Sequence, residues 1–546
     1  MGGSSGSTPR TVAGLLDERA AAHPDRPAVV FAEGALSYGE LAANTRRLAG
    51  RLVAFGVRPG DVVGLLSDGD PDTVVALLAA SRIGAVCLPV NNRFRAGELR
   101  HVIDNGDVRV LLTTPRFHDE ISAALPGLPG PSCHDVHIPD APALRHVADL
   151  AQTVAAAGTI ADDDLAARFQ AGVTGDSELV MIYTSGTTAR PRGCLHSHAG
   201  YLRQGSDIAS ALRLRPDDRF WTPLPFFHVG GYDVLFASLH AGATMVHSGT
   251  FVPGRALDQL AVQRCTVAFP AFETIWLPVL QHPRFAESDL SALRTVVNVG
   301  APERMEAMQR ALPHAVQVSC TGSTESAGFC CIGSPEDPPE VRARVAGRVN
   351  PGMQARVVNP ETGAEVADGT PGEFVFRGAY RFLRYHRDPE LTADRINAEG
   401  WYHSGDQVVR DSEGRYAYLG RLGDMLKVGG ENVSPTEVEG HLSTHPAVNM
   451  VQVVAAPDAR YGEVPAAFVM PHEGARVTEQ DIIAHCLDAI STFKVPRYVF
   501  FVDEWPMSGT KIQKFALRER VATHLTTHGI TEAPRLSSTR HHPTTS

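Results

Sequence analysis

Two kinds of apolar pattern alternate along the first part of the chain. Short continuous apolar runs, which are typical of buried strands, occupy residues 61–67, 85–90 and 108–113. Segments whose apolar residues recur every three or four positions, as in amphipathic helices, occupy residues 71–83 and 96–105. Strands that alternate with helices in this way predict parallel βαβ units.

Local signals define further elements in this part of the chain. Ser37 and Glu40 have the spacing of a capping box, which predicts a helix that begins there and runs toward Phe55. The proline-rich stretch 126–142 predicts a connecting loop, and the alanine-rich stretch 151–170 predicts a helix.

Four more apolar runs have the pattern of buried strands. They occupy residues 179–183, 267–270, 295–299 and 315–319. After the first, third and fourth of these runs come loops rich in Gly, Ser and Thr or Pro, which begin at residues 184, 300 and 320. Since ligands of open α/β sheets bind at the carboxyl ends of parallel strands, these loops are candidate ligand-binding segments.

The pattern changes in the last 200 residues. From Val345, glycines punctuate short β-prone runs such as Glu373–Phe376, which predicts a small β subdomain. Residues 422 to about 521 have the pattern of a compact α+β unit, with helices near 435–443 and 479–487. The expected fold class is α/β, with a large N-terminal domain of parallel βαβ subdomains, a small β subdomain and a small α+β C-terminal domain. The expected boundaries are a flexible arm at 1–9, an N-terminal domain at 10–421, a C-terminal domain at 422–525 and a disordered tail at 526–546.

Length and charge narrow the class of protein. A chain of 546 residues is too long for a single core, so more than one domain is expected. The net charge of −11 argues against nucleic acid as a partner. We find no apolar run long enough for a membrane span and no secretory signal, and the eight cysteines are scattered. These features favour a cytoplasmic protein with free thiols.

The segment after the strand at 179–183 has the composition of an anion-binding loop. Thr184, Ser185, Gly186, Thr187 and Thr188 offer hydroxyl donors and successive backbone N–H groups, which suit a polyphosphate. The P-loop spacing of the common nucleotide hydrolases is absent. Taken alone, such a loop is also compatible with an ordinary surface turn.

A second block with chemical content surrounds His228. Aromatic residues precede the histidine and two glycines, Gly230 and Gly231, follow it, a mixture that suits the wall of an apolar pocket. The alternative for His228 is a packed core histidine.

Eight blocks with chemical content follow one another in a fixed order. They are Tyr183-Thr184-Ser185-Gly186-Thr187-Thr188, Pro225-Phe226-Phe227-His228, Gly300-Ala301-Pro302, Gly322-Ser323-Thr324-Glu325, Tyr402-His403-Ser404-Gly405-Asp406, Gly420-Arg421, Lys427-Val428-Gly429-Gly430-Glu431-Asn432-Val433 and Lys511-Ile512-Gln513-Lys514. In this order they closely resemble the adenylate-forming superfamily of acyl-CoA synthetases, peptide-synthetase adenylation domains and luciferases. The resemblance covers roughly residues 10 to 525.

The resemblance implies roles for particular residues. Lys511, Glu325 and His228 are the candidate catalytic residues, with Lys511 bridging the acyl carboxylate and the phosphate, and Glu325 and Thr184 are the candidate Mg²⁺ ligands. The implied nucleotide-binding residues are Thr184, Ser185, Gly186, Thr187, Thr188, Arg192, Gly300, Ala301, Pro302, Thr321, Gly322, Ser323, Thr324, Asp406 and Arg421. The implied coenzyme A segment contains Lys427, Gly429, Gly430 and Glu431.

The implied activity is that of an AMP-forming acyl-CoA ligase. Such an enzyme uses ATP and Mg²⁺ to join a carboxylic acid to AMP, and a rotation of the C-terminal domain then lets coenzyme A take the acyl group. Phe227 and His228 stand where amino-acid adenylation domains place an aspartate, which favours an acid without an α-amine. Amide synthesis and non-catalytic binding of an acyl-adenylate are the alternatives.

Five positions depart from the family pattern. They are Ala189, Arg192, Thr321, Gly423 and Thr510. Thr321 replaces an aromatic residue that stacks on adenine, and Thr510 replaces the glycine before the catalytic lysine. These departures raise a sharper hypothesis, that the enzyme is weak in adenylation and transfers mainly a preformed acyl group supplied by a second synthetase. The alternative is ordinary divergence with both half-reactions retained, which the presence of Lys511, Glu325, Asp406 and Arg421 favours.

Overall fold

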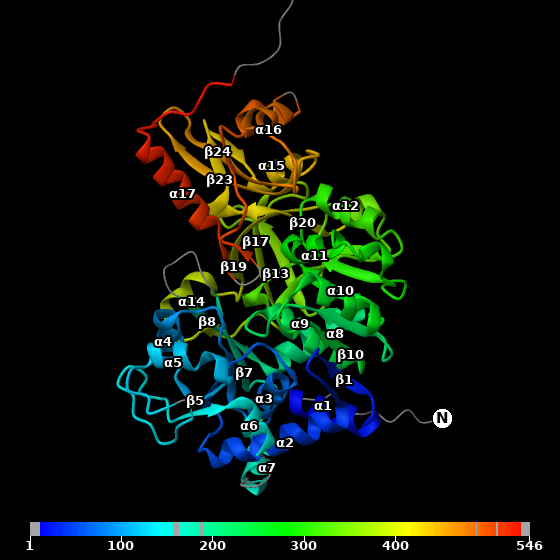
Figure 1. Ribbon diagram of the computed structural model, residues 1–546, viewed down its shortest axis with the longest axis vertical. Coiled ribbons are helices and arrows are strands. Elements are labelled where there is room, and N and C mark those ends of the chain that lie inside the picture. Colours follow the sequence, from blue (N-terminus) through cyan, green and yellow to red (C-terminus); the bar gives the residue numbers. More distant parts are fainter. Residues whose placement is uncertain are drawn as a thin grey trace, which may run out of the picture.

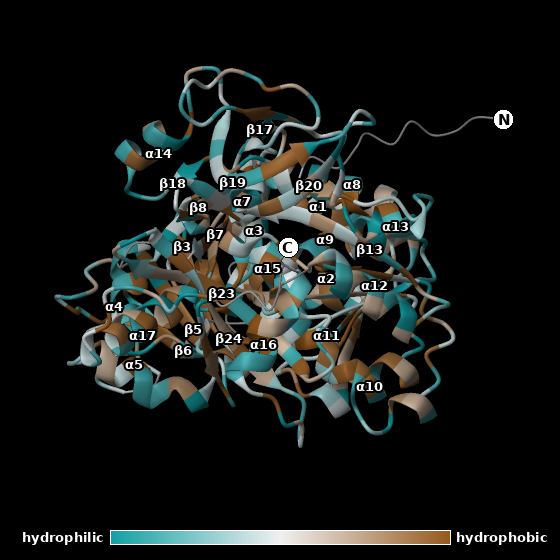
Figure 2. Ribbon diagram, turned by 90° about the horizontal axis from the view of Figure 1, so that it is seen from above, coloured by the Kyte–Doolittle hydropathy of each residue, from teal (hydrophilic) through white to brown (hydrophobic). Residues whose placement is uncertain are grey.

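The structure is a computed structural model. It describes residues 11–130, 132–156, 163–184, 191–487, 489–508 and 511–536. Its elements form two large sheets and a smaller C-terminal sheet, with helices packed against them (Figure 1). Strand interiors are mostly apolar and the outer loops carry most of the polar residues (Figure 2).

The largest sheet combines a parallel half and an antiparallel half. In the described residues its order is β16 (Met353–Val358), β17 (Gly372–Gly378), β19 (Tyr402–Arg410), β20 (Arg415–Arg421), β15 (Gly347–Val349), β14 (Gly328–Ile332), β13 (Val316–Ser323), β12 (Thr295–Asn298), β11 (Val267–Ala271), β9 (Arg219–Thr222), β10 (Thr244–His247), β1 (Pro27–Val30) and β2 (Ala35–Ser37). β13 pairs in parallel with β12 and antiparallel with β14. The predicted β subdomain is therefore continuous with the parallel sheet, and β13 joins the two.

The second sheet carries the first predicted βαβ units. Its order in the described residues is β18 (Arg384–Tyr385), β8 (Arg192–Ser197), β7 (Glu178–Thr184), β4 (Val86–Pro89), β3 (Val62–Leu66), β5 (Val108–Thr113) and β6 (His146–Asp149). β3, β4, β5 and β7 run parallel, as expected. β8 turns back antiparallel on β7, which brings the residues on both sides of the predicted anion loop together.

The helices begin where the local signals predict. Glu40 N donates to Ser37 Oγ at 3.2 Å and Ser37 N donates to Glu40 Oε2 at 2.8 Å, which completes the capping box at the start of α2 (Tyr38–Ala54). The remaining helices of the N-terminal part are α1 (Val12–Ala22), α3 (Pro71–Arg82), α4 (Ala96–Asn105), α5 (His118–Ala124), α6 (Leu150–Ala155), α7 (Asp163–Gly172), α8 (His198–Ala211), α9 (Val229–Ala241), α10 (Pro253–Val262), α11 (Glu273–Leu280), α12 (Pro302–Ala311), α13 (Pro339–Arg342) and α14 (Pro389–Arg395).

The C-terminal elements have a hydrophobic core of their own. β22 (Glu431–Val433), β21 (Leu426–Val428), β24 (Gly462–Pro471), β23 (Val448–Asp458) and β25 (Tyr498–Phe501) form one sheet, and α15 (Pro435–Leu442), α16 (Glu479–Cys486) and α17 (Lys514–Thr527) pack with it at one end of the molecule (Figure 1). The boundary at residues 421 and 422 itself remains a prediction.

Three expectations about local structure need correction. The single helix expected at 151–170 is replaced by α6 and α7, with residues 157–162 outside the described part. The strand expected at 315–319 continues to Ser323, because β14 hydrogen-bonds to its last residues. The tail expected from 526 still packs on the C-terminal core at Ala533, which is 4% exposed and whose N–H bonds Asp458 Oδ2.

Within the described residues, no helix has both the length and the apolar character required to cross a lipid bilayer.

One glycine permits the close packing of β14 and β15. Gly347 has a φ of +89°, and a Cβ placed on it would lie 1.9 Å from the Ile332 carbonyl oxygen. Gly347→Ala is expected to lower the free energy of unfolding by about 3 kcal/mol, since backbone strain and a backbone clash combine. Urea unfolding measures this loss.

The matched control is Gly97→Ala on α4, where an added Cβ meets no atom within 4 Å. That substitution is expected to leave stability unchanged or raise it by up to about 1 kcal/mol. Equal effects of the two substitutions would contradict the packing described at Gly347.

Candidate active site

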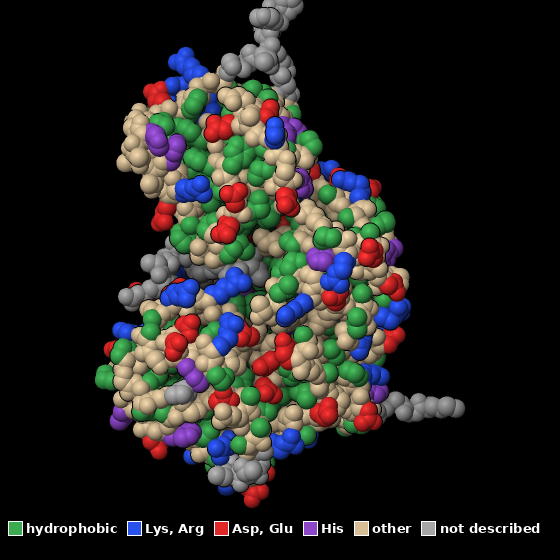
Figure 3. Space-filling model, viewed as in Figure 1, with side chains coloured by type: hydrophobic (Ala, Val, Ile, Leu, Met, Phe, Trp, Pro, Cys, Tyr) green, Lys and Arg blue, Asp and Glu red, His purple; other side chains and the backbone are tan. Residues whose placement is uncertain are grey.

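A cavity of about 420 Å³ lies where β11, β12 and β13 end beneath the C-terminal elements. Figure 3 shows the surface hollowed between the C-terminal part and the rest of the molecule, with Lys and Arg side chains beside the hollow. The predicted site residues that line the cavity are His228, Gly300, Ala301, Pro302, Thr321, Gly322, Ser323, Thr324, Asp406, Arg421 and Lys511. Folding thus collects into one place residues that the sequence spreads over more than half its length.

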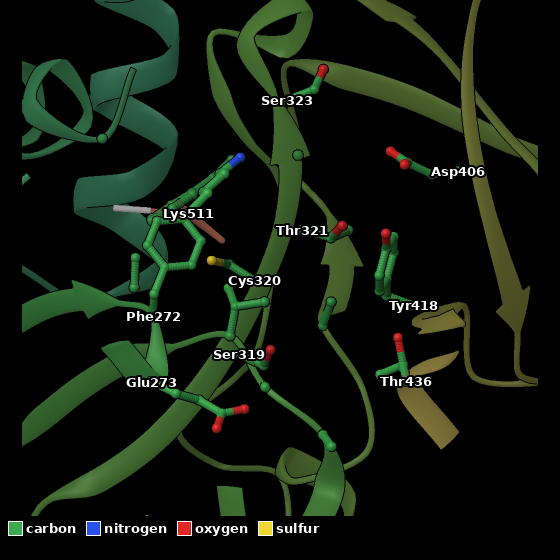
Figure 4. Close-up of a pocket in the computed structure, with 18 of the residues that line it drawn as sticks. Phe272, Glu273, Ser319, Cys320, Thr321, Ser323, Asp406, Tyr418, Thr436 and Lys511 are labelled. Carbon is green, nitrogen blue, oxygen red and sulfur yellow. The ribbon is translucent and has the colours of Figure 1, made fainter. Parts of the chain in front are cut away.

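Lys511 enters the cavity from the C-terminal part. It begins β27 (Lys511–Ile512), which pairs with β26 (Met507–Ser508), and its Nζ lies 5.5 Å from the centroid of the Phe272 ring. Figure 4 shows Lys511 beside Phe272, with Asp406 on the other side of the cavity. Burial and the Arg421 charge lower the pKa of Lys511, while Asp406 and Glu325 oppose this shift. The Lys511 amine therefore lies near charges of both signs, the positive charge of Arg421 and the negative charges of Asp406 and Glu325. Thr510, which precedes it, lies outside the described residues.

Asp406 and Arg421 form an ion pair at the opposite wall. They face each other across β19 and β20, and Arg421 Nε lies 2.9 Å from Asp406 Oδ1. Asp406 is 8% exposed, and burial raises its pKa to about 6 in spite of Arg421. The carboxylate offers a buried acceptor that a ligand with hydroxyl donors could use.

Neither Glu325 nor Thr184 lines the cavity. Both act on the buried thiol of Cys194: burial and the Glu325 charge raise its pKa, and a hydrogen bond with Thr184 opposes this shift. Tyr385 Oη donates to Glu325 Oε1 at 2.7 Å. Among the described residues, no group of three or more His, Cys, Asp or Glu side chains is arranged to hold a metal ion. One carboxylate nevertheless fits Mg²⁺ in a nucleotide site, because phosphates and water supply its other ligands.

β7 and β8 frame the predicted phosphate loop. Thr184 and Arg192 are paired across these strands, so the hydroxyl and the guanidinium stand at the two ends of the loop. Ser185, Gly186, Thr187, Thr188 and Ala189 lie outside the described residues.

His228 caps α9 at the cavity wall. Its Nε2 is buried and has no hydrogen-bond partner among the described residues. Burial, together with the Lys511 and Arg93 charges, lowers the pKa of His228 to about 3. The ring is therefore neutral near pH 7, and a proton-donating role is unsuited to it.

Tyr418 and Arg304 are among the cavity residues that the sequence interpretation did not single out. Tyr418 lies opposite Thr321 in Figure 4 and lines the same cavity, so an aromatic ring is present although Thr321 carries none. Arg304, two residues after Pro302 on α12, pairs with Glu273 at 3.4 Å and donates to the Asn449 carbonyl at 2.5 Å. It joins the N-terminal part to β23. In the sequence, Arg304 follows Gly300 by only four residues, and this closeness to a predicted site block could have marked it as a site residue.

The predicted coenzyme A segment lies elsewhere. Lys427, Gly429, Gly430 and Glu431 belong to the hairpin of β21 and β22, are exposed, and do not line the cavity. Glu463 and Tyr461 anchor this hairpin, through bonds from Lys427 N and Gly429 N of 2.9 and 2.8 Å. Gly423 lies in the short turn before it, and a Cβ there would meet nothing within 4 Å.

Comparison with known proteins places the chain in a family. Residues 16–386 match the AMP-binding enzyme model and residues 437–511 match the AMP-binding enzyme C-terminal domain. The chain belongs to this AMP-binding enzyme family, which confirms the resemblance drawn from the sequence. Its branch is that of the AMP-forming acid–CoA ligases, enzymes that use ATP and coenzyme A.

Relatives in this branch match nearly the full chain. A feruloyl-CoA synthase of an Amycolatopsis species is 32% identical over 92% of this chain and 97% of its own length. A methyl-dioxo-octahydroindenyl propanoyl:CoA ligase of Mycobacterium tuberculosis is 34% identical over 93% and 99%. The solved structure of ATP-bound MatB from Rhodopseudomonas palustris has a TM-score of 0.80, with 27% identity over 93% of this chain and 98% of that one.

Proposed function

We propose that this chain is an acyl-CoA ligase that performs both half-reactions. In the first, a carboxylate oxygen attacks the α-phosphorus of ATP and pyrophosphate leaves. In the second, the thiol of coenzyme A attacks the acyl carbon of the mixed anhydride and AMP leaves. The observation that supports this proposal is the position of Lys511, in one cavity with Asp406, Arg421 and the Gly300 block.

The geometry suggests a role for each wall of the cavity. The Lys511 cation offsets the negative charge that builds up between the carboxylate and the α-phosphate, and such fixed charge lowers the barrier. Asp406 accepts hydrogen bonds from the ribose hydroxyls, and Arg421 holds its carboxylate in place. Gly300, Pro302 and Tyr418 border the space for the adenine, and neutral His228 positions the acyl group.

A second set of residues, at and beside the predicted phosphate loop, suits the phosphates of ATP. Thr184, Arg192 and Thr324 hold the triphosphate, and Glu325 would hold Mg²⁺, which neutralises phosphate charge when bound. Tyr385 fixes the Glu325 carboxylate through its 2.7 Å hydrogen bond.

The second half-reaction requires a different arrangement. The hairpin with Lys427, Gly429, Gly430 and Glu431 is exposed and away from the cavity, so it would have to approach before coenzyme A reacts. Rotation of the C-terminal part would withdraw Lys511 and bring the hairpin in. Breaking the bond from Arg304 to Asn449 would be part of this movement.

The class of carboxylic acid that the enzyme activates is also part of the proposed function. The relatives named above act on a phenylpropenoid acid and a fused-ring acid, which differ in shape. We propose a carboxylic acid without an α-amine, because no carboxylate stands directly after Phe226.

Two parallel feeds test the proposal. A panel of free acids with ATP, Mg²⁺ and coenzyme A is compared with the matching synthetic acyl-adenylates and coenzyme A, and acyl-CoA is measured by mass spectrometry. Product from both feeds is expected. Product from the adenylates alone would favour the rival hypothesis of a second synthetase that supplies adenylate, and amide formation with added amines would favour amide synthesis.

The pKa of Asp406 predicts how ATP binding depends on pH. The ionised carboxylate accepts the ribose hydroxyls, and with a pKa of about 6 it is lost as pH falls through this value. The KM for ATP is therefore expected to rise about tenfold between pH 7 and pH 5. Steady-state pyrophosphate release at saturating acid measures it.

Asp406→Asn provides the baseline for this measurement. The variant binds ATP weakly at every pH, and its profile reports the titration of ATP itself. A wild-type profile with the same slope as that of Asp406→Asn would contradict the role proposed for Asp406.

A further inference from the structure

A second carboxyl group, Asp233, lines the cavity and takes no part in the chemistry above. It lies on α9, five residues beyond His228, and is 1% exposed. At 1.5 Å per residue, it stands about 7.5 Å farther along the helix axis than His228. Since the Lys511 charge acts on His228, substrate atoms beside Asp233 lie farther from the reacting carboxylate than those beside His228.

The structure is built to hold this carboxyl group. Gln204 Nε2, on α8, donates to Asp233 Oδ1 and also to the Ala327 carbonyl at 3.0 Å. Gly328 has a φ of +102°, and a Cβ there would lie 2.1 Å from Asp233 Oδ1. Any other residue at position 328 would displace the carboxyl group.

The surroundings of Asp233 contain no compensating charge. No ion pair to Asp233 exists in the described part of the chain, and Gln204 is its side-chain hydrogen-bond partner there. Beside Gly328, the rings of Phe329 and Phe269 pack at 4.6 Å between centroids and line the same cavity. Burial raises the pKa of Asp233 well above its usual range. Burial without a compensating charge favours the protonated form of Asp233, which offers one donor and spare acceptor capacity.

Gln204 adds an acceptor without a partner. It is fully buried, and its Oε1 has no hydrogen-bond partner among the described residues. Gln204 does not itself line the cavity, but it hydrogen-bonds Asp233, which does. A buried polar atom left without a partner costs free energy, so its retention next to Asp233 supports a polar ligand at that carboxyl group.

We propose that Asp233, held in place by Gln204, recognises an uncharged oxygen, a hydroxyl or a carbonyl, at the end of the acyl substrate opposite its carboxylate. This inference rests on the proposed acyl-CoA ligase activity and names its substrate class: acids with an apolar body and one distal neutral oxygen. An unsubstituted acid of the same shape would leave the polar pair unsatisfied.

Matched pairs of acids test the inference. The probes are 4-hydroxycinnamate against cinnamate and 6-oxoheptanoate against heptanoate, each with ATP, in the full-length enzyme. The wild type is expected to favour the oxygen-bearing member by about 10²-fold in kcat/KM for at least one pair. Asp233→Asn retains a donor and an acceptor and is expected to keep this preference within about tenfold.

Asp233→Leu removes both groups and is expected to abolish the preference while the KM for ATP stays unchanged. Ser238→Ala, also buried on α9 but not part of the cavity wall, is the matched control with wild-type preference. The inference would be overturned if Asp233→Leu kept the wild-type preference. It would also be overturned if the wild type used both members of each pair with equal kcat/KM, and this second result does not depend on the folding of any variant.

An acid with a distal amine that outcompetes both members of a pair would also overturn it, since an ammonium group would pair with an ionised Asp233. Failure of the proposed function looks different: no acyl-CoA then forms from any acid or adenylate. In that case the inference falls with it.

Discussion

Replacement of Lys511 by glutamine is expected to lower the rate of acyl-adenylate formation by about 10²–10³-fold, because the site loses the cation that offsets charge at the α-phosphate. Transfer of the acyl group from a synthetic adenylate to coenzyme A is expected to continue, since Lys511 would leave the cavity for that step. Pyrophosphate release and acyl-CoA formation, measured separately, give the two rates.

Lys494→Gln is the matched control for Lys511. Lys494 is another C-terminal lysine, bonded to Glu437 at 2.5 Å and absent from the cavity wall. It is expected to retain both activities. If Lys511→Gln kept full adenylation, the position of Lys511 in the cavity would no longer support the proposed function.

A substitution in the hairpin of β21 and β22 is expected to impair acyl transfer and to spare adenylation. Gly430→Val is expected to lower acyl transfer from the adenylate by about 10²-fold, because a side chain at the approach of coenzyme A displaces the reacting thiol. Adenylation is expected to change less than about threefold, since a Cβ on Gly430 meets nothing within 4 Å in the present arrangement.

Gly474→Val separates this effect from backbone strain. Gly474 also has a positive φ, +75° against +96° at Gly430, and its Cβ would also meet nothing. Both substitutions are expected to reduce stability by about 1–2 kcal/mol, but only Gly430→Val affects acyl transfer. Equal loss of acyl transfer in the two variants would contradict a role of the hairpin in the second half-reaction.

Under the proposed function, Lys511 and Gly430 serve different half-reactions from two surfaces of the C-terminal part. A variant at one is expected to complement a variant at the other when free adenylate is exchanged between them. We expect the departures at Ala189 and Thr510, which lie outside the described residues, to affect adenylation and not acyl transfer. Measurement of the two half-reactions therefore also decides how far these departures weaken adenylation.

The sequence by itself determined most of the local structure. Ser37 with Glu40, and the apolar runs of the first βαβ units, predicted α2, β3 and β5 because caps and apolar periodicity depend on residues only a few positions apart. The ordered blocks also sufficed to predict the family, which the comparisons confirmed.

The extent of some elements depended on distant partners. β13 extends to Ser323 because β14 pairs with it, and no residue within the segment 316–323 indicates this. The junction of the parallel and antiparallel halves of the sheet, which borders the cavity, is a consequence of that pairing.

Only the tertiary structure decided the composition of the cavity. Asp233 reads in the sequence as one polar residue of an apolar helix, and Tyr418 as one aromatic residue of a strand. Burial, the approach of Gln204 and the space left by Gly328 make Asp233 a candidate recognition group. The same folding brings Lys511 into the cavity and leaves Gly430 outside it. These properties arise from contacts between segments far apart in the chain, and local propensity carries no information about such contacts.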